Sequence, residues 1–241
     1  MKKCIELARL GEGQTSPNPM VGCIVLDKNE NEISTGYHHK YGDNHAERDA
    51  LLKLHNGEEK GGTLIVNLEP CSHHGKTPPC ADLIIERGLK RVVIGMQDVN
   101  PIVAGNGIRK LQNAGIKIVE NVLKDECQKL NEVFIKNMTE NKTFIAIKTA
   151  TTLDGKTATS NGSSKWITSE QARQEVKKIR NKYDAIMTSS ATILADNPTM
   201  LHRKKIILDK DLKTNLETQI YKNGEIYLFN ATLDMFEGGI N

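Results

Sequence analysis

The sequence lacks any apolar run approaching the roughly 20 residues that a membrane-spanning helix requires. Aromatic residues are also scarce, at 4% of the 241 residues, with a single tryptophan. At the N-terminus, Glu6 and Arg9 interrupt the apolar stretch that a signal peptide would need, so this segment is better explained as an amphipathic helix. We therefore expect no membrane partner and a cytoplasmic location.

A strong excess of charge of one sign is absent as well. The formal net charge is only +3, and lysines and arginines are scattered among acidic residues. Nucleic-acid-binding domains typically carry a basic patch with interleaved aromatic residues, so we expect no nucleic-acid partner. Five cysteines are an odd number, and Cys4, Cys23 and Cys127 lack disulfide-like spacing. In a reducing cytoplasm, the remaining Cys71 and Cys80 suggest a metal site or catalysis.

The length predicts two domains, and the first shows alternating strand and helix patterns. The expected strands are Val21–Leu26, Thr63–Leu68 and Arg91–Met96; the expected helices begin near His45, Pro78 and Asn106, and a longer helix covers Leu123–Met138. This alternation predicts an α/β fold, with a mainly parallel sheet between two helical layers. The polar stretch Thr139–Lys142 is the expected boundary, which places the first domain at residues 1–140.

A second α/β pattern occupies residues 143–241. Strands are expected at Thr143–Ala150 and in the segments DAIMTSS, KKIILD and EIYLFNA. A helix is expected after a capping box formed by Thr168 and Gln171. The pattern stops without an evident closing strand or helix, so this domain is expected to be incomplete at its C-terminus.

Three potential zinc ligands lie where strands end or helices begin. Cys71 follows the strand TLIVNL, Cys80 lies in the first turn of the next helix, and His45 opens a helix of the preceding unit. Such positions meet at one edge of an open α/β sheet. Catalytic zinc sites use three protein ligands and leave one position open for water. We therefore expect one zinc ion here, and expect the helix start to lower the pKa of the Cys80 thiol.

Glu47 is the expected catalytic residue. It lies two residues after His45, so it points in a different direction and can reach a water molecule beside the metal. The non-ligand glutamate of zinc deaminases has this role in the signature H-x-E…P-C-x-x-C. Here eight residues, SHHGKTPP, separate Cys71 from Cys80 instead of two, and are expected to form a loop at the mouth of the site.

Less specific explanations remain open for these residues. The two thiols can be small core residues, or His73 or His74 can complete a closed structural zinc site in a non-catalytic binding module. His73, His74 and Lys76 either contact a substrate phosphate or form a solvated loop. Asn18, between two prolines in SPNPMVG, either pairs with the edge of a flat heterocycle or only shapes a turn.

The second domain has the composition of an anion-binding α/β domain. Its turns are rich in serine, threonine, aspartate and glycine, which leave backbone N–H groups available. Arg180 and Arg203 offer fork-shaped donors for a phosphate, and Trp166 can either stack on a flat ring or belong to the core. No G-x-G-x-x-G motif follows a strand, so an ordinary Rossmann dinucleotide site is not expected.

Four stretches together resemble the deaminase domain of the bifunctional riboflavin-biosynthesis deaminase–reductase family: TSPNPMVGCIV, HAERDAL, EPCSHHGKTPPC and DVNPIVAGNGI. The resemblance extends from Ala8 to Asp209. It implies a cytidine-deaminase-like three-layer domain that deaminates a phosphoribosylated diaminohydroxypyrimidine. His45, Cys71 and Cys80 match the family's zinc ligands, and Glu47 matches its proton donor.

The second domain resembles the family's reductase, which is similar in fold to dihydrofolate reductases and reduces the ribosyl chain to ribityl with NADPH. The resemblance implies two sets of residues. Ala150, Trp166, Thr192 and Asp196 would face the nicotinamide cofactor, and Ser164, Arg180, Met200 and Arg203 would face the phosphorylated substrate. Family members continue further, and FEGGIN only superficially matches their late cofactor loop, so loss of reductase activity is an alternative.

Two further expectations remain. A deaminase of nucleosides or of tRNA adenosine is the alternative enzyme, although the weak basic character and the second domain argue against it. Homo-oligomers are common among proteins of this kind, so a homo-oligomer is expected.

Overall fold

The structure, a computed structural model, describes residues 1–55, 57–74, 78–101 and 104–230. The chain divides into two compact units, Met1–Asn141 and Lys142–Asn241. Of the segments discussed above, Lys76 and FEGGIN lie outside the described residues.

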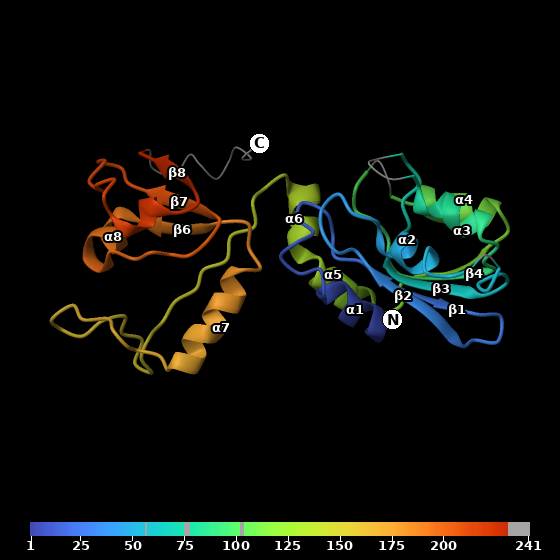
Figure 1. The fold of residues 1–241 in the computed structure, drawn as a ribbon, viewed down its shortest axis with the longest axis horizontal. Helices are drawn as coiled ribbons and strands as arrows, with labels where there is room; N and C mark the ends of the chain where they lie inside the picture. The colour runs from blue at the N-terminus through green and yellow to red at the C-terminus, as the bar shows by residue number, and fades with distance from the viewer. Residues whose placement is uncertain (56, 75–77, 102–103, 231–241) are drawn as a thin grey trace. The chain divides into compact units, whose positions relative to one another are not determined.

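The first unit is built on a five-stranded mixed sheet with the strand order β2-β1-β3-β4-β5 (Figure 1). Its strands are β1 (Gly22–Leu26), β2 (Glu32–Tyr37), β3 (Thr63–Leu68), β4 (Arg91–Met96) and β5 (Lys117–Val119). Strand β1 pairs antiparallel with β2 and β3, whereas β3, β4 and β5 are parallel. The three predicted strands are confirmed, but β2 and β5 were missed, and the β1–β2 hairpin makes the sheet mixed rather than mainly parallel.

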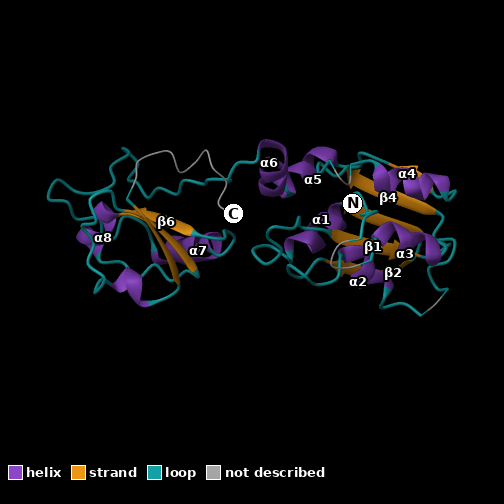
Figure 2. Cartoon of the chain, turned by 90° about the horizontal axis from the view of Figure 1, so that it is seen from above, coloured by secondary structure: helices purple, strands orange, loops and turns teal. Residues whose placement is uncertain are grey.

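Helices cover both faces of this sheet, which gives three layers (Figures 1 and 2). One face carries α1 (Lys2–Arg9) and α5 (Lys124–Leu130); the other carries α2 (Ala46–Leu51), α3 (Cys80–Glu86) and α4 (Asn106–Asn113). The core consists of the apolar residues of β1, β3 and β4 and the inner faces of these helices. Gly22 allows α1 to approach β1 closely, because a Cβ there would collide with the backbone carbonyl of Cys4.

The long helix predicted over Leu123–Met138 is instead two helices, α5 and α6 (Glu132–Glu140). They are separated at Asn131, whose backbone leaves the helical region with φ −107° and ψ 25°. The apolar spacing continues through this residue, so it did not reveal the break. Asn131 is 2% exposed, and its side-chain amide hydrogen-bonds to the backbone of Met20.

The second unit contains a parallel three-stranded sheet with the order β6-β7-β8. Its elements are α7 (Glu170–Arg180), β6 (Ile186–Ser189), α8 (Ser190–Asp196), β7 (Lys204–Leu208), the 3-10 helix η1 (Gln219–Lys222) and β8 (Glu225–Phe229). A small core of Ile193, Ile207 and Ile220 joins α8, β7 and η1.

Two predictions for this unit were wrong. Thr143–Ala150 forms no strand, because none of the described strands pairs with it, and Ile147 is 87% exposed. The cap of α7 is Ser169 rather than Thr168, since the Ser169 hydroxyl accepts a hydrogen bond from the Ala172 N–H at 3.2 Å. Among the described residues, no helix is long and apolar enough to cross a membrane.

Candidate metal centre and its cavity

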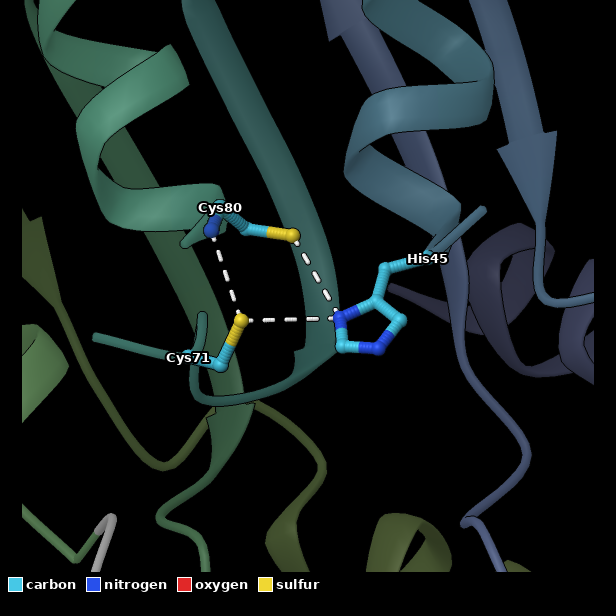
Figure 3. A group of neighbouring side chains, drawn as sticks. All are labelled: His45, Cys71 and Cys80. Atoms are coloured by element: carbon cyan, nitrogen blue, oxygen red, sulfur yellow. Dashed lines mark hydrogen bonds between the residues drawn. The ribbon is translucent and has the colours of Figure 1, made fainter. Parts of the chain in front are cut away.

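The three predicted zinc ligands converge from three elements of the first unit (Figure 3). His45 is the N-cap residue of α2, Cys80 is the first residue of α3, and Cys71 follows the end of β3. The Nδ1 atom of His45 lies 3.5 Å from the Sγ atom of Cys71 and 3.5 Å from that of Cys80. All three donor atoms lie within 4.8 Å of one another.

These separations fit a tetrahedral zinc ion. With a Zn–S distance of about 2.3 Å and a Zn–N distance of about 2.0 Å, tetrahedral angles place sulfur and nitrogen about 3.5 Å apart. The side chains are therefore arranged so that one ion can bind all three without backbone movement. His73 lies in the wall of the same cavity and is not in this cluster of three donors.

The two thiols differ in their electrostatic environment. Hydrogen bonds from the Cys80 side chain and from His45 lower the pKa of Cys71 despite its burial. The Cys80 backbone N–H also donates to the Cys71 sulfur at 3.3 Å. The pKa of Cys80 is raised instead, by its interaction with Cys71 and by burial. The predicted lowering of the Cys80 pKa is therefore wrong: its backbone N–H donates to the Cys71 sulfur, where it adds to the larger effects of the Cys80 side chain and His45.

The other three cysteines are core residues. Cys4, Cys23 and Cys127 are fully buried. Burial raises the pKa of Cys4 to about 12 and that of Cys127 to about 11, and it raises the pKa of Cys23 well above its ordinary value. What distinguishes the pair in the cluster is its geometry, because only Cys71 and Cys80 have their sulfur atoms close to a histidine nitrogen and to each other among the described cysteines.

Glu47 lies beside the three donors and is 3% exposed. Burial, followed by the charge of Cys71, raises its pKa to about 7. A bound dication would act in the opposite direction and favour the ionised carboxylate, which can accept a proton. Glu47 and His45 both line a cavity of about 280 Å³.

The predicted residue Asn18 also lines this cavity, where it is oriented by His38. The Asn18 Nδ2 atom lies 3.1 Å from Nε2 of His38, and Nδ1 of His38 lies 2.9 Å from the carbonyl oxygen of Asn44. Because a carbonyl can only accept, Nδ1 of His38 carries the proton and Nε2 accepts from the Asn18 amide. This hydrogen bond uses one of the two Asn18 N–H groups and fixes the orientation of the amide, so its oxygen is placed as an acceptor beside the remaining N–H donor.

Sequence reasoning missed several residues that line the cavity. They are His38, Tyr41, Asp43, Glu69, Asp98, Asn100 and Phe134. Most belong to segments with no recognised metal-ligand or catalytic spacing. Glu69 and Asp98 lie inside stretches that did carry the family resemblance, so their presence in EPC and DVNP was the available signal.

The predicted reductase residues occupy several segments of the second unit. Ala150, Ser164 and Trp166 lie in the segment before α7; Arg180 ends α7; Thr192 and Asp196 lie on α8; Met200 and Arg203 precede β7. Thr192 and Asp196 are four residues apart and therefore share one face of α8.

Their environments differ. Trp166 is 72% exposed and is covered by the Arg173 guanidinium at 4.2 Å from its ring centroid, so it is not a core residue. Met200 packs against the small core of this unit. The exposed Arg203 has its Nε atom 3.9 Å from the Glu225 carboxylate. The proposed contacts of these eight residues with cofactor and substrate therefore stay a prediction.

Comparisons with known proteins agree with this division of the chain. Residues 1–96 match the family model of the cytidine and deoxycytidylate deaminase zinc-binding region, and residues 143–234 match that of the RibD C-terminal domain. A crystal structure of a diaminohydroxyphosphoribosylaminopyrimidine deaminase/5-amino-6-(5-phosphoribosylamino)uracil reductase from Thermotoga maritima is 43% identical, with a TM-score of 0.87, and the match covers 95% of this chain and 68% of that one. The chain belongs to the RibD family.

Other RibD proteins support the same conclusion. Acinetobacter baumannii RibD in its form 1 structure is 38% identical with a TM-score of 0.86, over 94% of this chain and 67% of that one. The riboflavin biosynthesis protein RibD of Actinobacillus pleuropneumoniae is 46% identical over 235 residues, and that of Escherichia coli K12 is 46% identical over 203 residues. These matches cover 94% and 84% of this chain, which spans 62% and 55% of the two relatives.

The resemblance predicted from the motifs is therefore confirmed, as is the α/β fold with a cytidine-deaminase-like first domain and a reductase-like second domain. Membership in the RibD family implies Zn²⁺ and NADPH as cofactors.

Proposed function

We propose that the first domain, residues 1–140, catalyses hydrolytic deamination of a phosphoribosylated diaminohydroxypyrimidine in riboflavin biosynthesis. The observation that carries this proposal is the cavity that Glu47 shares with His45 and Cys71. A buried acid next to three clustered donor atoms is the arrangement that a zinc-dependent hydrolysis requires. The names of the RibD relatives support the choice of reaction.

In this proposal, His45, Cys71 and Cys80 hold one zinc ion per chain. When bound, zinc supplies Lewis-acid activation of a water nucleophile. Glu47 accepts the proton that the attacking water loses and delivers it to the departing amine, so the leaving group is ammonia. The position of Glu47 supports this role, because its buried carboxylate lies in the same cavity as His45 and Cys71, within reach of a water molecule beside the donors.

The polar wall of the cavity would orient the pyrimidine. Asn18 can present its amide oxygen as an acceptor, because the hydrogen bond with His38 fixes which end of the amide is the nitrogen. An N–H group on the heterocycle is the complementary donor. His73 and His74 lie in the loop after Cys71, where the substrate phosphate is a suitable partner for them.

We further propose that the second domain, residues 143–241, reduces the deaminated product with NADPH. The match to the RibD C-terminal domain supports this activity. Ala150, Trp166, Thr192 and Asp196 are proposed to contact the cofactor, and Ser164, Arg180, Met200 and Arg203 the substrate. The exposure of Trp166 is consistent with stacking on a flat ring. A chain that only deaminates is the alternative outcome.

We also propose a cytoplasmic location and a homo-oligomeric state. The free thiols of all five cysteines support a reducing compartment. Analytical ultracentrifugation of the full chain tests the oligomeric state directly.

Ammonia release by the purified chain tests the deaminase proposal. The substrates to compare are the phosphoribosylaminopyrimidine, cytidine and adenosine, with zinc measured on the same preparation. We expect release from the first substrate only, and Glu47→Gln should lower kcat by at least about 10²-fold while zinc stays bound. The exposed Glu86→Gln is the matched control. Release from adenosine instead would identify a nucleoside deaminase, and a zinc-loaded but inactive chain would identify a binding module. NADPH oxidation after deamination tests the second domain.

A further inference from the structure

Glu69 is a buried acid in the cavity wall to which the proposed mechanism gives no role. It is 3% exposed and immediately follows β3. Its carboxylate accepts four backbone hydrogen bonds. Oε2 accepts from the N–H groups of Asp98 at 3.2 Å and Gly105 at 2.9 Å, and Oε1 from those of Gly107 at 2.9 Å and Ile108 at 3.2 Å.

This arrangement commits the Glu69 carboxylate to the backbone. A carboxylate offers about four lone-pair positions, and backbone N–H groups occupy all four. Two of these groups belong to the first turn of α4, where N–H groups have no partner within the helix. A negative charge is also favourable at this end of a helix. The carboxylate thus binds backbone instead of substrate.

The start of α4 is packed directly against the loop that carries a metal ligand. A Cβ at Gly107 would collide with the carbonyl oxygen of Pro70, the residue between Glu69 and Cys71. Only glycine permits this approach. Glu69 and Gly107 therefore join the metal loop to the start of α4 by two independent features, a set of hydrogen bonds and a close backbone contact.

The segment attached in this way forms part of the cavity wall. Asp98 and Asn100 both line the cavity. The Asp98 N–H is held by Glu69, and the Asp98 carboxylate in turn accepts the Asn100 N–H at 2.8 Å. A chain of hydrogen bonds thus runs from Glu69 to two polar residues that face the ligand space.

We propose that Glu69 is a positioning residue for substrate binding, which sets Asp98 and Asn100 relative to the metal ligands. This proposal rests on the proposed deaminase function. Substitution of Glu69 should weaken substrate binding more than it slows the chemical step, because its four hydrogen bonds go to the Asp98 segment and the start of α4 and none goes to Glu47 or to a metal donor.

Glu69→Gln is the informative variant. Glutamine keeps the size of the side chain, but its NH₂ group would face two backbone N–H donors in place of an acceptor oxygen. Gly107→Ala disturbs the same junction from the helix side and leaves the carboxylate in place. Glu86→Gln makes the same chemical change on the exposed surface of α3 and is the control.

Two measurements on the full zinc-loaded chain test the proposal. In Glu69→Gln, the backbone amides of Gly105, Gly107 and Ile108 should exchange with solvent at least about 10-fold faster than in the wild type. The KM for the phosphoribosylaminopyrimidine should rise about 10-fold or more, with kcat changed less than about 3-fold and zinc content unchanged. Gly107→Ala should give the same division between KM and kcat, and Glu86→Gln should change neither measurement.

The outcomes separate this proposal from the deaminase proposal. An unchanged KM in a folded Glu69→Gln protein that has lost amide protection would overturn the positioning role and leave a purely stabilising one. A wild-type chain that releases no ammonia would refute the proposed function. In that case the role of Glu69 is decided by amide exchange alone. Unchanged exchange in Glu69→Gln would then overturn the positioning role.

Discussion

Two buried asparagines hold the segment that carries Asn18, and their energetic coupling can be predicted from the hydrogen bonds. Asn67, on β3, accepts from the Gly22 N–H at 2.7 Å and donates to the Met20 carbonyl at 3.0 Å. Asn131, between α5 and α6, accepts from the Met20 N–H at 2.8 Å and donates to the same carbonyl at 3.0 Å. The Met20 carbonyl therefore accepts hydrogen bonds from both asparagines, whereas the N–H groups of Gly22 and Met20 each donate to only one of them.

Each single substitution leaves one N–H without its side-chain acceptor. Asn67→Ala removes the partner of Gly22 and Asn131→Ala that of Met20, and in both variants the carbonyl keeps one donor. An unsatisfied buried group costs about 1–3 kcal/mol and a lost hydrogen bond about 0.5–1.5 kcal/mol. We expect each variant to lower the free energy of unfolding of the first unit by about 2–3 kcal/mol.

The double variant should be worse than the sum of the two. Only in that protein does the Met20 carbonyl lose both donors, which adds about 1–2 kcal/mol to the combined loss. Native-state amide exchange of β1 and β3 measures the opening free energy of this unit. Fluorescence does not serve here, because the single tryptophan, Trp166, lies in the second unit. Asn137→Ala, at an exposed position of α6, is the control. Additivity of the two losses within about 0.5 kcal/mol would refute the shared-carbonyl reasoning.

Three other perturbations test separate parts of the structure. Cys71→Ser should reduce bound zinc from one ion per chain to a small fraction, as measured by elemental analysis after dialysis. Cys127→Ser, the control, should leave the zinc content unchanged. Equal loss in both variants would contradict the assignment of the ligands. Gly22→Ala should destabilise the first unit by about 1–3 kcal/mol, because the added methyl group would collide with the backbone of α1. Unchanged amide exchange in α1 would argue against that contact. In the second unit, burial acts to raise the pKa of Asp209, but hydrogen bonds from the Thr214 and Lys213 backbone lower it overall below 3.8. Its folded-state pKa is thus below the unfolded value, so its stabilisation is present at pH values above the unfolded pKa and is lost as the pH falls through the folded pKa. Asp209→Asn should lower the urea midpoint of Trp166 fluorescence at neutral pH, and the difference from wild type should shrink on acidification; a difference independent of pH would exclude this origin.

Local patterns predicted the elements whose periodicity is unambiguous. The apolar runs of β1, β3 and β4 are buried on both faces, so their position is visible in composition alone. Strand β2, with the sequence EISTGY, alternates between buried and partly exposed residues after an exposed Glu32 and offers no such run. The predicted strand Thr143–Ala150 has the right residues, but a strand also requires a neighbour, and pairing is a tertiary property that a local pattern does not contain.

The same distinction separates the metal ligands, which the sequence predicted, from the residues of the cavity wall, which it did not. His45 and Glu47 share a short spacing, and the two cysteines lie in one compact motif, so residue chemistry identified them. Glu69 lies in the same motif, but its role depends on the start of α4 meeting the end of β3. That contact joins residues 38 and 39 positions apart, and no local signal reports it.

The end of β3 explains why these features occur together. Asn67, Glu69 and Cys71 are spaced two residues apart, and each holds a different part of the site. Asn67 binds the backbone before β1 that carries Asn18, Glu69 binds the start of α4 and the Asp98 segment, and Cys71 lies with the metal donors. A shift of this one strand would therefore move the Asn18 amide, the cavity wall and a metal ligand together. Asn67 and Glu69 are buried polar residues at the end of an apolar strand, and such burial is favourable only when their hydrogen bonds are formed. Correct folding of β3 thus selects the same geometry that the proposed hydrolysis requires.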